Sequence, residues 1–259
     1  VVKNVTGYDL SKLMAGSWGT LGIMTDVTIK VLPRAEAELT VLVLALDAER
    51  AVKAMAVAMG SANEVSGAAH VPAESTPALP GMIEELRAVT ALRLEGVPPS
   101  VAHRREQLLA LMKPFGDVAV LEGAASQALW ASIRDVMPFA LQNGPKERPL
   151  WRISSAPMSG PEIVKHISAQ VSADVIYDWA GGLIWMQLAS HHDPHADLVH
   201  RAVAAQGGHA TLIRASAGIR AAVDVFEPQP APLAALTRRV KDSFDPKRVL
   251  APGRMYAGV

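Results

Sequence analysis

The sequence contains no cysteine, few aromatic residues and no net charge. The absence of cysteine excludes disulfides, thiolate nucleophiles, cysteine-ligated zinc and iron–sulfur clusters bound by this chain. The 25 Lys and Arg residues balance the 25 Asp and Glu residues, so there is no positive field to hold nucleic acid or an anionic membrane. No apolar run reaches the roughly 18–20 residues that a membrane-spanning helix needs.

What the sequence does contain is typical of a globular protein. The 259 residues are 50% apolar and 19% charged, which is enough for one or two domains with a real core and excludes wholesale disorder. The chain opens Val1-Val2-Lys3-Asn4-Val5, a β-like run without an initiator Met or a basic signal region. We therefore expect the chain to be a fragment that begins within a strand.

Two stretches of the chain share one order of strands and helices. In residues 39–121, a buried strand (39–46) precedes a helix that Asp47 caps and Gly60 ends. Two strands (64–71 and 89–94), a helix (99–112) and a short strand (118–121) follow. In residues 150–214, the strands are predicted at 150–154, 175–179, 184–188 and 211–214. One helix there begins at a Ser159–Glu162 capping box, and the other runs from Asp193 to Gly207.

Each stretch reads β-α-β-β-α-β, the split βαβ arrangement of ferredoxin-like units. The sequence therefore predicts an α+β fold with tandem ferredoxin-like units at 39–121 and 150–214, joined by a helix at 125–136. The Gly181-Gly182 pair between two of the strands predicts a hairpin turn.

The two ends of the chain have a different character. In residues 1–34, Asp9 caps a short helix (10–15), and a glycine-rich loop follows it, with the sequence Gly16-Ser17-Trp18-Gly19-Thr20-Leu21-Gly22. Residues 23–32 alternate apolar and polar, which predicts a half-buried strand that Pro33 ends. Near the C-terminus, one helix face carries Leu233, Leu236, Val240 and Phe244.

Two segments at these ends carry a family resemblance. The first is Lys3-Asn4-Val5-Thr6-Gly7-Tyr8-Asp9-Leu10 with the glycine-rich loop, and the second runs from Phe244-Asp245-Pro246 to Pro252-Gly253-Arg254-Met255-Tyr256. Together they resemble the FAD-linked oxidases of the vanillyl-alcohol oxidase and p-cresol methylhydroxylase type, most closely the FAD-binding E subunits of bacterial glycolate oxidases. The second segment departs from the family at Ala251, where Asn usually precedes Pro-Gly.

The resemblance implies a division of the chain into three segments. Residues 1–34 would be the C-terminal remnant of an FAD-binding domain, residues 35–225 the cap over the flavin, and residues 226–259 a segment that returns to the FAD domain. In the family the glycine-rich loop lies against FAD, and the matching positions here are Gly16, Ser17, Gly19, Thr20, Gly22 and Ile23. The family's Gly-rich pyrophosphate loop has no counterpart, so we expect this chain alone to bind FAD weakly or not at all.

The resemblance also implies an activity and partners. The protein would be a subunit that oxidises a small 2-hydroxy acid, first of all glycolate, or relays its electrons. Arg152 and Arg214 would bind the substrate carboxylate, and His209 would take the hydroxyl proton. A sister flavin subunit and an iron–sulfur subunit would complete the assembly, in the cytoplasm or held by partners at the inner face of the membrane.

Two other functions are compatible with the residues. One is a non-enzymatic ligand-sensing or protein-interaction module, since tandem ferredoxin-like units serve both purposes. The other is an FAD-linked oxidase of the D-lactate dehydrogenase kind. No metal site is expected, because the histidines at 191, 192, 195 and 200 lack the spacing of a zinc motif and fit a polar loop and helix start.

Overall fold

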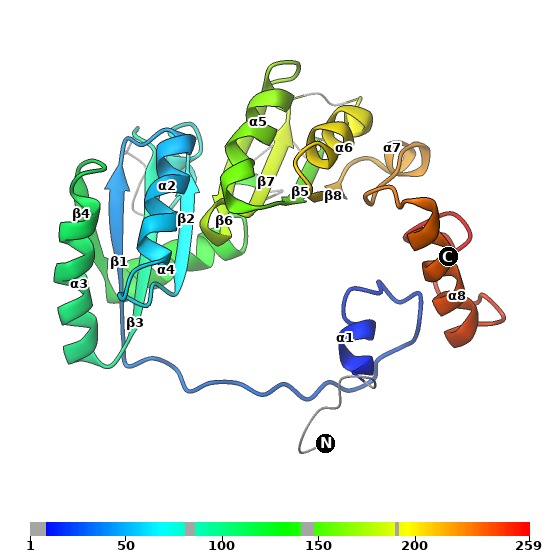
Figure 1. Cartoon of the computed structure of the whole chain (residues 1–259), viewed down its shortest axis with the longest axis horizontal. Coiled ribbons are helices and arrows are strands. Elements are labelled where there is room, and N and C mark those ends of the chain that lie inside the picture. Colours follow the sequence, from blue (N-terminus) through cyan, green and yellow to red (C-terminus); the bar gives the residue numbers. More distant parts are fainter. Residues whose placement is uncertain (1–8, 81–85, 141–147, 190–191) are drawn as a thin grey trace. The chain divides into compact units, whose positions relative to one another are not determined.

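The computed structural model describes residues 9–80, 86–140, 148–189 and 192–259 (Figure 1). They form two compact units. The larger unit runs from Pro33 to Val223, and the smaller one combines the segment that ends at Leu32 with the segment from Asp224 to Val259. Each unit is described by itself below.

The larger unit is built on one antiparallel sheet with the order β4-β1-β3-β2-β6-β7-β5-β8. Its first half comprises β1 (Ala37–Leu44), α2 (Ala48–Met59), β2 (Gly67–Val71), β3 (Val89–Gly96), α3 (Pro98–Met112) and β4 (Val118–Glu122). Its second half comprises β5 (Leu150–Ser154), α5 (Gly160–Ser168), β6 (Ala173–Asp178), β7 (Leu183–Leu188), α6 (Ala196–Ala204) and β8 (His209–Arg214). The predicted α+β class and the two β-α-β-β-α-β orders are confirmed.

The two halves join into a single sheet through their β2 and β6 edges. The paired residues at this seam are His70 on β2 and Tyr177 on β6, and their rings lie 5.8 Å apart. β2 is an edge strand of the first half and β6 is an edge strand of the second. Pairing these two strands satisfies backbone N–H and C=O groups on both edges at once.

Helices cover the two faces of the sheet differently. On β1, Val41 and Val43 pack with α2 and α3, whereas Leu42 packs with α4 (Gly123–Arg134) on the opposite face. In the second half, Trp151 on β5 contacts α6 through His200, with ring centroids 5.3 Å apart. Since successive strand residues point to opposite faces, Arg152 projects from the same face as α4.

Several short elements complete the larger unit. They are the 3₁₀ turns η1 (Thr76–Ala78), η2 (Met137–Phe139), η3 (Pro157–Ser159) and η4 (Trp179–Gly181), and the helix α7 (Ala217–Ala222). Helix α7 was not predicted from the sequence; Ser216 caps its N-terminus, because the Ser216 hydroxyl accepts from the Ile219 N–H. The predicted hairpin at Gly181-Gly182 is confirmed, because β6 and β7 pair antiparallel up to Asp178 and Leu183. Its turn contains the 3₁₀ turn η4, which begins at Trp179.

Local predictions for three helices need adjustment. The Ser159–Glu162 capping box is wrong, because Ser159 already has helical torsions at the end of η3 and its side chain caps nothing. Helix α6 begins at Ala196 rather than at Asp193, after His195 in a left-handed conformation. In α2 the Asp47 cap is confirmed. Helical spacing predicts that Met59 points inward with Val52 and Met55, but Met59 is exposed while the other two are buried.

The strand predicted at residues 23–32 is also wrong. The structure contains no strand in this segment, and Ile29, Val31 and Leu32 are more than 70% exposed. A strand needs a partner for its backbone N–H and C=O groups, and no segment in the described ranges pairs with this one. The alternating pattern shows only that the segment suits a half-buried position in a sheet.

The smaller unit contains α1 (Leu10–Met14), the glycine-rich loop and α8 (Ala231–Phe244). As predicted, Asp9 caps α1 and accepts a hydrogen bond from the Lys12 N–H. Trp18 in the loop packs edge-on against Phe226, with ring centroids 5.5 Å apart. The loop is therefore packed against the C-terminal segment of the same unit.

Candidate functional site

The glycine-rich loop has an open outer face. Gly16 and Gly19 adopt φ values of +82° and +80°, and a Cβ added at either would meet no atom within 4 Å. Glycine is thus needed at both positions for conformation rather than for space. Among the described residues, the backbone N–H groups of Gly19 and Gly22 have no hydrogen-bond partner, so a ligand can approach them.

The other residues that the resemblance assigns to FAD contact divide into two kinds. Ser17 and Thr20 are buried, and the Thr20 hydroxyl donates to the Ser17 carbonyl at 2.7 Å. Gly22 packs near the Met14 sulfur, and Ile23 is 81% exposed. Ser17 and Thr20 therefore hold the shape of the loop, while Gly16, Gly19 and Ile23 lie on its accessible side.

A buried lysine joins the loop to the C-terminal segment. Lys241 on α8 is fully buried, and its Nζ donates to the Thr20 carbonyl, the Leu250 carbonyl and the Asp245 carboxylate, each at 2.7 Å. The hydrogen bond from Lys241, together with the N–H groups of Leu250 and Val249, lowers the pKa of Asp245 to about 2. The two segments that carry the family resemblance are thus held together by one ammonium group, a role that no local sequence signal indicated.

This loop fits a dinucleotide. Its positive-φ glycines and free N–H groups let backbone lie directly against a ligand, and the buried Ser17, Thr20 and Lys241 fix that backbone from behind. The chemistry that the loop offers is backbone hydrogen bonding rather than charge.

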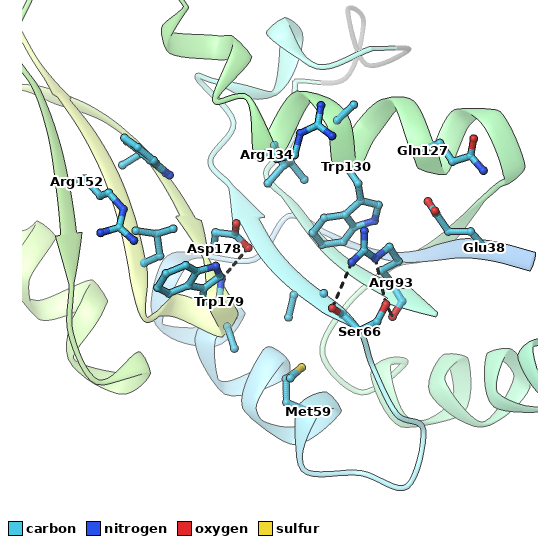
Figure 2. Close-up of a pocket in the computed structure, with 17 residues that line it drawn as sticks. Glu38, Met59, Ser66, Arg93, Gln127, Trp130, Arg134, Arg152, Asp178 and Trp179 are labelled. Carbon is cyan, nitrogen blue, oxygen red and sulfur yellow. Dashed lines mark hydrogen bonds between the residues drawn. The ribbon is translucent and has the colours of Figure 1, made fainter. Parts of the chain in front are cut away.

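The larger unit contains a cavity of about 840 Å³ on the face of the sheet that carries α4 (Figure 2). It extends across the seam between the two halves. Its lining includes three tryptophans, three arginines and two acids: Trp130, Trp179, Trp185, Arg93, Arg134, Arg152, Glu38 and Asp178. The cavity combines aromatic surface with several cationic groups, as ligand sites commonly do.

Two of the three arginines already have acidic partners. Arg93 lies over the Trp130 ring at 4.9 Å and pairs with Glu95 at 3.0 Å. Arg134 pairs with its neighbour Asp135 at 2.8 Å. Their guanidinium groups are therefore largely committed within the protein.

Arg152 is different. It is half-buried and forms neither an ion pair nor a hydrogen bond with any residue in the described part of the chain. Its guanidinium carbon lies 5.3 Å from the centroid of the Trp179 ring (Figure 2). Its cross-strand partner on β7 is Trp185. A guanidinium that lies over an aromatic ring makes no hydrogen bond to it, so the N–H groups of Arg152 can bind an anion in bidentate geometry.

The residues that hold Trp179 form an unusual turn. Trp179 and Ala180 have φ values of +51° and +58°, and Gly181 follows at +103°. A non-glycine residue in this region costs roughly 1–3 kcal/mol. The Asp178 carboxylate accepts from the Trp179 N–H at 2.7 Å, and burial raises the pKa of Asp178 against the opposing effects of that bond and of Arg93.

The structure does not gather the three predicted catalytic residues into one site. His209 is exposed at the start of β8, paired with Ser154, and lies outside the cavity lining. Arg214 ends the same strand and donates to the Phe139 carbonyl at 2.7 Å. Burial, and secondarily the charge of Arg148, lowers the pKa of Arg214. Only Arg152 lines the cavity, and Trp179 and Asp178 are cavity residues that sequence reasoning missed.

The described residues indicate neither a metal site nor a membrane-spanning helix. No group of three or more acids and histidines in the described ranges could hold a metal ion. Of the four clustered histidines, His191 lies outside the described residues, and His200 packs against Trp151. None of the described helices is both long enough and apolar enough to cross a membrane.

Comparisons with known proteins give related results in sequence and in fold. The chain is 32% identical to glycolate oxidase subunit GlcE of Escherichia coli over 99% of its own length and 60% of the relative's. It is 25% identical to glycolate oxidase subunit GlcD of Bacillus subtilis, over 69% of this chain and 39% of that one. No protein-family model matches the chain.

Among solved structures, p-cresol methylhydroxylase with substrate bound superposes with a TM-score of 0.59. The match covers 86% of this chain and 53% of that one, at 14% identity, so it bears on the fold alone. The chain spans less than two thirds of the length of each of these proteins. It is similar to glycolate oxidase subunit GlcE along nearly its whole length, and it shares the fold of the part of p-cresol methylhydroxylase that it matches.

Proposed function

We propose that the protein containing this chain is an FAD-dependent oxidoreductase subunit that oxidises a small 2-hydroxy acid, with glycolate as the first candidate. The observation that carries the proposal is the similarity to glycolate oxidase subunit GlcE over 99% of the chain. The open glycine-rich loop supports the cofactor, because Gly16 and Gly19 present backbone without side chains. When bound, FAD supplies the hydride acceptor that oxidation of an alcohol requires.

In this proposal Arg152 binds the substrate carboxylate. It is the cavity arginine without an acidic partner among the described residues, and a bidentate guanidinium–carboxylate pair would fix the orientation of a two-carbon acid. Arg214 is already bonded to a backbone carbonyl, so we assign it to holding the chain near Phe139. His209 is the proposed acceptor of the hydroxyl proton, on the same sheet face as Arg152, one strand away.

A second candidate is a subunit that relays electrons without oxidising the substrate itself. The separation of His209 from the cavity favours this role, since a proton acceptor must reach the reacting hydroxyl. In both roles we propose that the subunit works in the cytoplasm with a sister flavin subunit and an iron–sulfur subunit. This chain has no cysteine to ligate an iron–sulfur cluster, and in this proposal the cluster belongs to the iron–sulfur subunit.

The test uses the natural full-length protein, purified alone and with its partners. Bound flavin would give absorption bands near about 370 and about 450 nm, and anaerobic glycolate or D-lactate would bleach the second band. We expect Arg152→Met to lower kcat/KM by about 10-fold or more. The matched control is Arg201→Met, an exposed arginine on α6.

Three outcomes separate the alternatives. Bleaching of the isolated subunit by glycolate, lost in Arg152→Met, supports the oxidase. Bound flavin that glycolate reduces only in the presence of the partner subunits supports the electron relay. A full-length protein without flavin contradicts both.

A further inference from the structure

We infer that Trp179 is the positioning residue for a carboxylate site at Arg152. The inference rests on the proposed function only for the chemical class of the ligand. Its structural basis is the cation–π contact between the two side chains, in which the Arg152 guanidinium carbon lies 5.3 Å from the Trp179 ring centroid (Figure 2). Trp179 is not among the residues to which the family resemblance assigns a role.

Contact with Trp179 restricts the Arg152 side chain before any ligand binds. An arginine side chain on a strand loses considerable rotamer freedom when it binds a ligand, so an arginine that is already held binds more tightly. In this cavity, the face of Trp179 contacts Arg152, and no described acid forms an ion pair with it. The stack therefore keeps the cation in place while leaving the edge of the guanidinium free for a carboxylate.

Trp179 is an exposed residue with an unfavourable backbone conformation. The residue is 58% exposed, so burial of its ring contributes little to the core. Its φ of +51° would suit glycine better, and the adjacent Asp178 carboxylate holds that conformation through the Trp179 N–H. A large, exposed side chain in an unfavourable conformation at a cavity wall points to a function in that cavity.

The turn that carries Trp179 packs closely against its neighbours. A side chain at Gly181 would force a local shift, since a Cβ there would lie 2.8 Å from Val52 and 2.9 Å from the Pro157 carbonyl. The turn is thus fixed against α2 and η3, and Trp179 projects from a rigid support. A rigid support is what a positioning residue requires.

The experiment measures binding rather than turnover, by calorimetric titration of the full-length protein. The probes are glycolate and its uncharged analogue glycolamide. The wild-type protein should bind glycolate and discriminate against glycolamide, and Arg152→Lys should weaken glycolate binding by about 10-fold, because lysine cannot form the bidentate pair. Trp179→Gly should weaken it by about 3- to 30-fold, the range that loss of a cation–π contact spans.

Two further variants separate positioning from a structural role. Trp179→Phe keeps an aromatic face and should restore most of the affinity. Trp179→Gly suits the positive φ, so its thermal midpoint should stay at or above that of the wild type while its glycolate affinity falls. A merely structural tryptophan would lower the midpoint and leave the affinity unchanged.

The inference is overturned if Trp179→Gly binds glycolate as tightly as the wild type, or if the wild type binds glycolate and glycolamide equally or not at all. The results can distinguish failure of this inference from failure of the proposed function. Arg152-dependent and Trp179-dependent binding without flavin reduction would leave the inference standing and refute the oxidase. Flavin reduction with an unchanged KM in Trp179→Gly would do the reverse.

Discussion

Protonation of His70 should weaken the larger unit as the pH falls. His70 is 1% exposed, and its Nδ1 hydrogen bonds the Thr90 hydroxyl at 3.0 Å. Burial lowers the pKa of His70 to about 4, and the charge of Asp47 opposes this only partly. His70 also pairs with Tyr177 at the seam between the two halves of the sheet. Both residues line a second cavity, whose lining includes the acids Glu74 and Asp174.

The sign and size of the effect follow from this shift. Between the ordinary pKa of 6.5 and the folded value of about 4, the unfolded chain binds a proton that the folded chain excludes. Stability is therefore fully present above about pH 6.5 and is lost as the pH falls toward about 4. The difference between the two pKa values corresponds to about 3 kcal/mol of unfolding free energy.

The assay is urea unfolding followed by tryptophan fluorescence between about pH 7.5 and about pH 4.5, for wild type and His70→Asn. The asparagine amide can still reach the Thr90 hydroxyl but does not titrate, so the variant should lose less stability across this range. Comparing the two proteins cancels the contribution of the carboxyl groups. The control is His103→Asn, an exposed histidine on α3. The reasoning fails if His70→Asn loses as much stability as the wild type.

Two further predictions concern single buried contacts. Lys241→Met should destabilise the smaller unit by about 3 kcal/mol or more, because it leaves a buried carboxylate without its cation; urea unfolding followed through Trp18 fluorescence measures it. The deficit should shrink as the pH falls from the ordinary pKa of 3.8 toward about 2, where the wild-type Asp245 also becomes protonated, and a pH-independent deficit would contradict the ion pair. Gly181→Ala should cost about 2 kcal/mol, since its Cβ meets Val52 at a strained φ. Gly207→Ala, with a similar positive φ but open space, should cost about 1 kcal/mol in the same thermal unfolding assay. Equal losses would show that the close approach at Gly181 has no energetic effect.

The sequence by itself determined the local elements and their order. Apolar periodicity and turn residues located β5 at Leu150–Ser154 and the Asp47-capped helix α2, because these signals depend on neighbours a few residues away. The repeated β-α-β-β-α-β order led in turn to the tandem architecture. The glycine-rich loop was also predictable from the sequence, since glycine itself readily adopts the positive φ found at Gly16 and Gly19.

The tertiary structure alone decided which distant residues meet. A lysine on a helix is usually exposed to solvent. Lys241 is nevertheless buried, because three oxygens from separate segments converge on its ammonium group. Arg152, Arg214 and His209 were equivalent as charged or titratable residues near strands, and only strand order and turn geometry placed Arg152 in the cavity beside Trp179. The segment at 23–32 failed as a strand for the same reason: an alternating pattern is local, whereas a pairing partner is not.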